Sequence, residues 1–142
     1  MEIDVNSLYA TFQQLSDQRK ARGKRYELAL ILTLSVLAKL AGQDEPEGMA
    51  EWVKLRGETL RAGLGFSRAT LPHAVTYRRV LGTAVKREEL EQALGAFFKG
   101  CAGESQPLAI DGKALRGTIE PGQTRGVYLL AVYAPGSGVV LN

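Results

Sequence analysis

Residues 26–41 read YELALILTLSVLAKLA, and this stretch decides what kind of fold the chain can adopt. Apolar side chains fall on nearly every face of a helix drawn through it, and the longest apolar run, Leu28–Ala41, is interrupted at Thr33, Ser35 and Lys39. A helix that is apolar nearly all round is buried at the centre of a domain. The run is also shorter than the roughly 20 residues that a membrane span requires. The stretch therefore predicts a central core helix, with its core at 28–40, in a soluble protein without a membrane partner.

Helical spacing of apolar residues continues on both sides of this central segment. We expect Gly42 and Gly65 to end helices, because glycine is the usual residue just past a helix C-terminus. The further helices predicted are Asn6 or Ser7 to about Asp17, Pro46–Arg56, Glu58–Leu64, near His73 to Thr83, and Lys86 or Arg87 to about Cys101. The residues expected to face inward on them include Leu8, Phe12, Leu15, Met49, Trp52, Val53, Val75, Val80 and Leu81.

The composition changes near residue 104, where helical periodicity gives way to glycines, prolines and β-favouring runs. Leu108–Ile110 is a short apolar run, and Gly126–Ala134 (GVYLLAVYA) is rich in aromatic and β-branched residues, as strands are. Pro135–Gly138 predicts a turn that leads into Val139–Leu141. The sequence thus predicts a mainly α-helical domain over residues 1–103, followed over 104–142 by a first strand and a β-hairpin.

The overall composition excludes several classes of protein. The chain has 142 residues, 45% hydrophobic and 23% charged, which is ordinary for a globular domain and unlike a disordered chain. One cysteine and one histidine leave no disulfide framework and no zinc-finger spacing. Residues 1–7 lack the apolar segment of a signal peptide, so we expect a cytoplasmic location. The net charge of +3 indicates a polyanionic partner only weakly.

Positive charge gathers in two places on the helical part. The segment Gln18–Arg25 carries five basic residues, which can neutralise phosphates of DNA or can simply form a solvated linker. The short helices around Ser67–Leu81 suggest a helix-turn-helix whose second helix presents tandem arginines. The DNA-contacting candidates from these two segments are Arg19, Lys20, Arg22, Lys24, Arg25, Arg78 and Arg79.

The string Leu108–Gly117, LAIDGKALRG, carries the chemistry of the second part. An apolar strand delivers the carboxylate of Asp111 at its C-terminal end, Gly112 allows a ligand to come close, and Lys113 and Arg116 add positive charge. Such a carboxylate suits Mg²⁺ held beside a phosphate backbone. The alternative interpretation is a turn followed by two solvated basic residues.

Five ordered strings resemble those of DDE transposases from bacterial insertion sequences, in the ISAs-one group that includes the H-repeat-associated proteins. LAIDGKALRG is similar to the string around the first catalytic aspartate of that family. The other resembling strings are Asp17–Tyr26 (DQRKARGKRY, with Gln18 where the family usually has proline), Met49–Trp52 (MAEW), Leu71–Leu81 (LPHAVTYRRVL) and the hairpin of Gly126–Leu141. The resemblance covers nearly the whole chain.

The resemblance implies a helical N-terminal region followed by a ribonuclease-H-like core. In that core two Asp and one Glu hold two divalent metal ions, which activate water and then a DNA 3′-hydroxyl for attack on phosphodiesters. Asp111 matches the first of these residues and is the catalytic and Mg²⁺-binding candidate. We expect it to hold the ion in the full-length protein and not tightly in this chain alone. Lys113 and Arg116 beside it are further DNA-contacting candidates.

The chain departs from this pattern after Asp111, where Glu120 is the one acidic residue that follows. Because a single carboxylate cannot clamp two metal ions, the sequence predicts a truncated transposase. It would bind insertion-sequence ends and act in transposition only as part of the full-length protein. The alternatives are a non-catalytic module that binds DNA, itself or full-length transposase and inhibits it, and a non-functional remnant.

Overall fold

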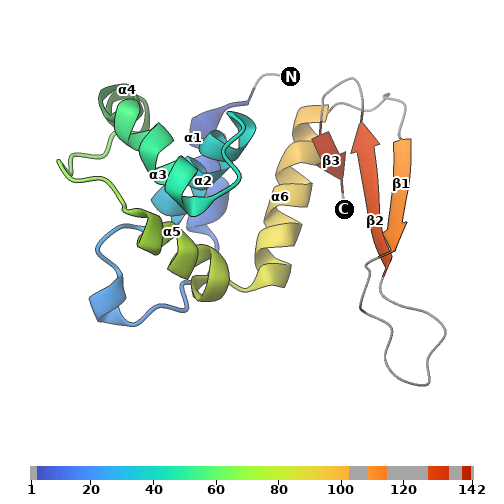
Figure 1. Ribbon diagram of the computed structural model, residues 1–142, viewed down its shortest axis with the longest axis horizontal. Helices are drawn as coiled ribbons and strands as arrows, with labels where there is room; N and C mark the ends of the chain where they lie inside the picture. Colours follow the sequence, from blue (N-terminus) through green and yellow to red (C-terminus); the bar gives the residue numbers. More distant parts are fainter. Residues whose placement is uncertain (1–2, 103–108, 115–127, 135–138, 142) are drawn as a thin grey trace. The chain divides into compact units, whose positions relative to one another are not determined.

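The computed structural model describes residues 3–102, 109–114, 128–134 and 139–141, and these are mainly helical, as predicted (Figure 1). The chain divides into two compact units, one of residues 3–93 and the other from residue 94 onward. The division falls inside a helix, whereas the change in composition predicts a boundary after residue 103.

The first unit is built from α-helices of six to 13 residues, one 3-10 turn and one π-helical turn. Five of its helices are α1 (Val5–Gln13), α2 (Leu28–Leu40), α3 (Pro46–Leu55), α4 (Gly57–Leu64) and α5 (Ala74–Arg79). A 3-10 turn, η1 (Ala21–Gly23), lies between α1 and α2, and a π-helical turn, η2 (Val80–Ala84), follows α5. The helix α6 (Arg87–Ala102) begins in this unit and continues into the next.

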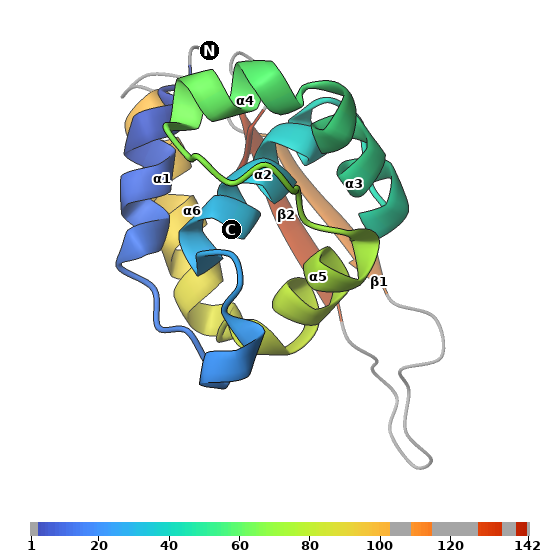
Figure 2. The ribbon, with the colours of Figure 1, turned by 90° about the vertical axis from the view of Figure 1, so that its left-hand side faces the viewer.

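Helix α2 is the core of the first unit, as its sequence predicts. It contacts α1, α3 and η2, and Figure 2 shows it between α1 and α3. Its buried polar residues are satisfied within the helix, since Thr33 Oγ1 and Ser35 Oγ each donate at 2.8 Å to the carbonyl four residues earlier. The prediction of a core extending to Leu40 is wrong at its end, because that side chain is 54% exposed. The buried residues of α2 are Leu28, Ala29, Leu30, Ile31, Leu32, Thr33, Leu34, Ser35 and Ala38.

Helix α1 begins and ends earlier than its sequence predicts. The N-cap is Asp4, whose side chain accepts from the Asn6 amide at 3.0 Å, rather than Asn6 or Ser7. The last helical residue is Gln13, not Asp17. Asp17 instead accepts a hydrogen bond from the amide two residues on, which is a local turn that competes with helix.

The two glycines predicted to end helices do so in the left-handed conformation. Gly42 has φ +87° after α2, and its amide donates to the Lys39 carbonyl at 2.9 Å. Gly65 has φ +68° after α4, with its amide 2.9 Å from the Arg61 carbonyl. Only glycine takes these angles without steric cost, so both helix ends were readable from the sequence.

The face buried by α5 and η2 differs from the predicted one. Val75 and Leu81, both expected inside, are 50% and 42% exposed, whereas Val80 is 1% exposed as expected. The buried residues of this segment are Tyr77, Val80 and Ala84, whose spacing of three and four residues places them on one helical face, and Leu81 lies off that face. On α3, Met49 and Val53 are buried as predicted, but Trp52 is only half-buried.

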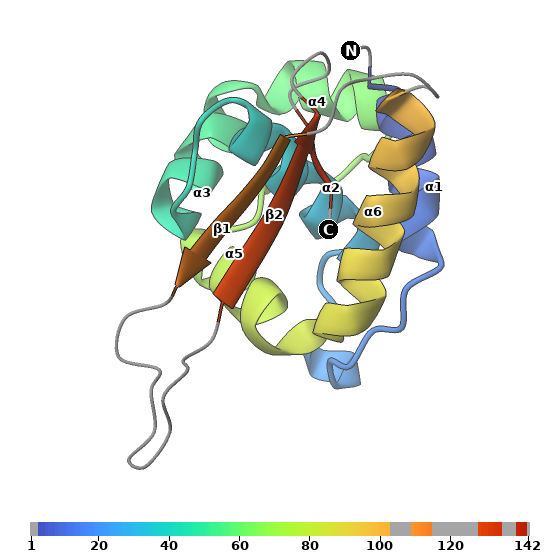
Figure 3. The ribbon, with the colours of Figure 1, turned by 90° about the vertical axis from the view of Figure 1, so that its right-hand side faces the viewer.

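The second unit contains three strands, β1 (Ala109–Ala114), β2 (Tyr128–Ala134) and β3 (Val139–Leu141), in the order β1-β2-β3. Both pairs are antiparallel, with Ile110 opposite Val132 in one and Tyr133 opposite Val140 in the other. Figure 3 shows β1 and β2 side by side with opposite directions. None of the helices described by the structure has both the length and the apolar character to cross a membrane.

Candidate nucleic-acid interface

An ion pair closes the base of the loop that joins α1 to α2. The Arg19 side chain donates to Asp17 through Nε at 2.9 Å and through Nη2 at 2.8 Å, and its amide donates to Asp17 Oδ1 at 3.0 Å. Nη2 of Arg19 also donates to the Tyr26 carbonyl at 2.9 Å. The pair is largely buried, with the side chains 10% (Arg19) and 19% (Asp17) exposed. Arg19 therefore ties the start of the loop to its end.

A second tether joins this loop to η2. The Gln18 amide donates to the Ala84 carbonyl at 2.8 Å. Because η2 directly follows the tandem arginines at the end of α5, the tether brings the two basic segments of the sequence onto neighbouring elements. Their proximity could not be read from the sequence, which separates them by more than 50 residues.

The remaining basic residues of the loop face solvent. We call Lys20–Arg25 the basic loop; it contains η1, and all four of its cationic side chains are exposed. Lys24 Nζ lies 4.0 Å from Asp17 Oδ2, and its side chain is 44% exposed. Four of the five predicted phosphate contacts in this segment, Lys20, Arg22, Lys24 and Arg25, are thus presented outward, while Arg19 is engaged internally.

An exposed arginine that the sequence did not single out lies against the end of the basic loop. The guanidinium carbon of Arg68 is 5.4 Å from the centroid of the Tyr26 ring. Tyr26 is only 7% exposed, and its hydroxyl donates to Thr70 Oγ1 at 3.2 Å. Both contacts join the loop to residues 65–73, the connector between α4 and α5. The sequence carries no local signal for contacts between segments so far apart along the chain.

The ion pair at the base of the loop makes the stability of the fold depend on acid pH. Hydrogen bonds from the Arg19 side chain lower the pKa of Asp17 below its usual value, and the charge of Lys24 adds to the effect. Because the folded-state pKa is depressed, the carboxylate stabilises the fold above the ordinary Asp pKa of about 3.9 and loses this contribution as pH falls through the folded value.

We expect Asp17→Asn to lower the free energy of unfolding at neutral pH by about 1–3 kcal/mol, since it weakens hydrogen bonds to a largely buried charged partner. The deficit should shrink as the pH falls below the ordinary Asp pKa of about 3.9 and through the lower pKa of the folded state. Urea unfolding of wild type and variant across this pH range measures it. Asp44→Asn, which breaks an exposed pair with Lys39, should cost little at either pH. An equal free energy of unfolding for wild type and Asp17→Asn at pH 7 would show that the pair does not hold the loop.

The tandem arginines occupy the outer face of α5. Both are exposed, and the Arg78 guanidinium pairs with Glu47 at the start of α3. The predicted helix-turn-helix is not formed, because nine residues, 65–73, separate α4 from α5, whereas that motif needs a turn of three or four residues. Arg79 therefore offers its charge from the surface of a short helix beside η2.

The strand β1 contains two of the candidates from the second unit. Asp111 lies opposite Ala131 and Lys113 opposite Leu129, so the strand continues past the aspartate to Ala114 rather than ending at it. Arg116 lies outside the described residues. Within the described parts of the chain, no three His, Cys, Asp or Glu residues come together as a metal site would require.

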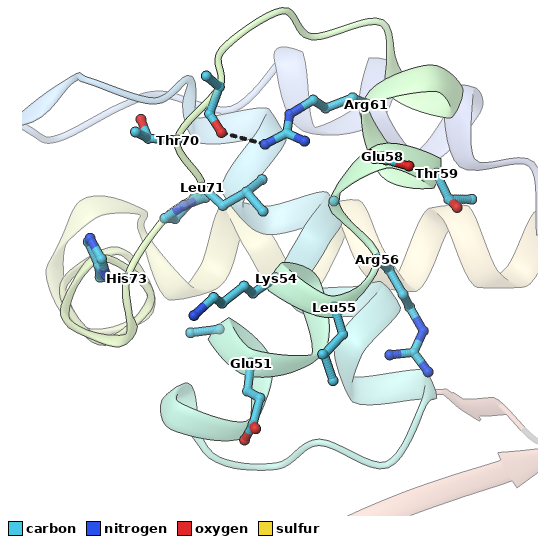
Figure 4. A pocket seen from close by; sticks show the side chains of 14 residues that line it. Glu51, Lys54, Leu55, Arg56, Glu58, Thr59, Arg61, Thr70, Leu71 and His73 are labelled. Atoms are coloured by element: carbon cyan, nitrogen blue, oxygen red, sulfur yellow. Dashed lines mark hydrogen bonds between the residues drawn. The ribbon is translucent and has the colours of Figure 1, made fainter.

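An open cleft of ≈ 930 Å³ lies between the end of α3, the start of α4 and residues 69–73 (Figure 4). Its lining mixes the cations of Lys54, Arg56 and Arg61 with the carboxylates of Glu51 and Glu58. The guanidinium of Arg61 is already hydrogen-bonded to the connector, through Nε to the Arg68 carbonyl at 3.1 Å and through Nη2 to Ala69. Since its charges nearly balance, the cleft attracts a polyanion less than the basic loop does.

Comparison with known proteins gives the family of the chain. The family described as DDE_Tnp_1-associated matches residues 9–98. A protein of Escherichia coli (strain K12) named "Putative transposase YncI" is 26% identical over 143 residues, which cover 99% of this chain and 57% of that protein. Its namesake in Escherichia coli O157:H7 is also 26% identical over 143 residues, which cover 99% of this chain and 36% of that protein.

The chain thus spans less than two thirds of each of these relatives. No solved structure matches it. The family match covers the helices from α1 to most of α6, and so includes the loop with its ion pair, the connector and the tandem arginines. This protein therefore belongs to the DDE_Tnp_1-associated family and is related to the N-terminal region of DDE-type insertion-sequence transposases.

Proposed function

We propose that the helical region of this protein binds the phosphate backbone of duplex DNA through the basic loop, as the DNA-binding part of an insertion-sequence transposase. The observation that carries the proposal is the presentation of four exposed cations on a loop fastened at its base. A solvated linker needs no such tethers. Arg78 and Arg79 lie at the end of α5, directly before the element to which Gln18 is tethered, and they extend the positive surface.

The chemistry of the loop favours backbone contacts over base stacking. Proteins that bind single strands present aromatic rings on which bases stack. The aromatic residue of this segment, Tyr26, is buried, and Arg68 lies over its ring. Duplex phosphates, which need only positioned charges and N–H donors, are the ligand that this surface fits.

Titration of a labelled duplex against the purified protein tests the proposal. The affinity should fall linearly with salt on a log–log plot, with a slope of about −0.9 for each phosphate neutralised. Fluorescence anisotropy at several salt concentrations measures the slope. Absence of binding at low salt, or an affinity that ignores salt, would contradict the proposal.

For the second unit, we propose that β1, β2 and β3 belong to a ribonuclease-H-like core and that Asp111 is one of its Mg²⁺ ligands. Asp111 occupies a central position of β1, two residues before Lys113, and a carboxylate is the kind of hard oxygen ligand that Mg²⁺ prefers. Metal-dependent strand transfer would then belong to the complete catalytic site of the transposase. Broadening of the amide signals around Asp111 by Mn²⁺, and its loss in Asp111→Ala, is the corresponding test.

A further inference from the structure

Of the five cations that the sequence places between Arg19 and Arg25, four are exposed in the folded protein and Arg19 is largely buried. Arg19 hydrogen-bonds to both Asp17 oxygens and to the Tyr26 carbonyl, and its side chain is 10% exposed. Moving its guanidinium onto a phosphate would leave the Asp17 carboxylate, 19% exposed, without this partner. Separating such a largely buried pair is costly, so Arg19 serves the shape of the loop rather than its ligand.

Arg68 is a further exposed cation beside the basic loop. Its guanidinium carbon lies over the ring of Tyr26, the residue that directly follows the basic loop. Its backbone is held from the other side, because the Arg68 carbonyl accepts from Arg61 Nε at 3.1 Å. The hydrogen bond between Tyr26 and Thr70 fixes the same connector to the loop. Three contacts thus place an exposed arginine beside the loop without using its own N–H groups.

The contact between Arg68 and Tyr26 is made through the ring and not through a hydrogen bond, because the guanidinium carbon lies over the ring, 5.4 Å from its centroid. The N–H donors of a guanidinium suit bidentate binding of phosphate. In the described part of the chain the Tyr26 ring is the one side-chain partner of this guanidinium. An arginine held in one orientation loses less conformational entropy on binding than a freely rotating one.

We propose that Arg68, supplied by the connector between α4 and α5, is a phosphate-binding residue of the basic-loop surface and takes the place that the sequence assigns to Arg19. The proposal rests on the proposed DNA binding and names a residue of the same site. It also makes the surface composite: DNA would join the α1–α2 loop to a connector from another part of the chain.

The test compares Arg68→Ala with Arg56→Ala in the same salt titration of duplex DNA. Arg56 is a matched control, because it is an exposed arginine stacked on a ring, 4.7 Å from the Trp52 centroid. It lies between α3 and α4, outside the α1–α2 loop and the connector. Arg68→Ala should lower the magnitude of the salt slope by about 0.9, equivalent to about 3.5-fold less loss of affinity between about 50 and 200 mM salt. Arg56→Ala should leave the slope unchanged.

Arg68→Lys separates charge from structure. Lysine keeps the positive charge but is a poorer stacking group, so it should retain the slope if phosphate binding is the role. A slope lowered equally by Ala and Lys would assign Arg68 to covering Tyr26 and overturn the proposal. An unchanged slope in Arg68→Ala, with wild type binding DNA, would overturn it while leaving the proposed function intact. Failure of wild type itself to bind would instead remove the proposed function.

Discussion

Alanine at Lys20, Arg22, Lys24 and Arg25 together should remove most of the salt-dependent DNA affinity of this protein. Each phosphate contact contributes about −0.9 to the log–log slope, so loss of four contacts should reduce its magnitude by about 3.6. Between about 50 and 200 mM salt, that difference corresponds to a roughly 150-fold change in affinity. The folded state should be unaffected, since all four side chains are exposed.

A second quadruple variant, with the same loss of charge outside the basic loop, separates the effect of local DNA contacts from the effect of net charge. Alanine at Lys39, Lys54, Arg56 and Lys99 also removes four exposed cations but leaves the basic loop intact. We expect its salt slope to match that of wild type. Equal slopes for the two quadruple variants would mean that the loop has no special place in binding, and that the overall charge of the chain accounts for its affinity.

The helices were predictable because each carries its own local signals. The apolar run that became α2 could only be a core helix, and Gly42 and Gly65 marked helix ends that need positive φ. The end of α1 was placed too late because periodicity continues through Leu15. The helix ends at Gln13, and Asp17 instead accepts from the amide of Arg19 in a local turn, a hydrogen bond that periodicity does not register.

The buried face of α5 and η2 follows helical periodicity, but through other residues than those predicted. Tyr77, Val80 and Ala84 are buried at spacings of three and four residues, which place them on one helical face. Val75 and Leu81 are larger apolar residues than Ala84, but they are exposed. Choosing the large aliphatic residues of the segment therefore selected two exposed side chains and missed the tyrosine and the alanine that are buried.

The candidate interface was predicted from a cluster of basic residues in the sequence, whereas in the structure it also depends on contacts between segments far apart along the chain. The run correctly identified four exposed cations, and their role in DNA binding stays a prediction. Arg19 pairs with Asp17, which is two residues away in the sequence, and it also donates a hydrogen bond to the carbonyl of Tyr26, seven residues away. The contact between Arg68 and Tyr26 joins two residues far apart in the sequence, and a search for clusters of basic residues along the chain therefore missed it.

Leu34→Ala should be the most destabilising of the simple substitutions in α2. The side chain is 0% exposed in the helix that contacts α1, α3 and η2, so its removal loses burial and leaves a cavity among several elements. Such substitutions cost about 2–5 kcal/mol, a large part of the roughly 5–15 kcal/mol that holds a domain folded. At about 3 kcal/mol, the Tm should fall by roughly 12–24 °C for a unit of this size.

Leu40→Ala makes the same chemical change in the same helix at a side chain that is 54% exposed, and it should cost no more than about 0.5 kcal/mol. Thermal and urea unfolding of the two variants measure the difference. Similar losses at both positions would show that α2 is not the core around which the helices pack.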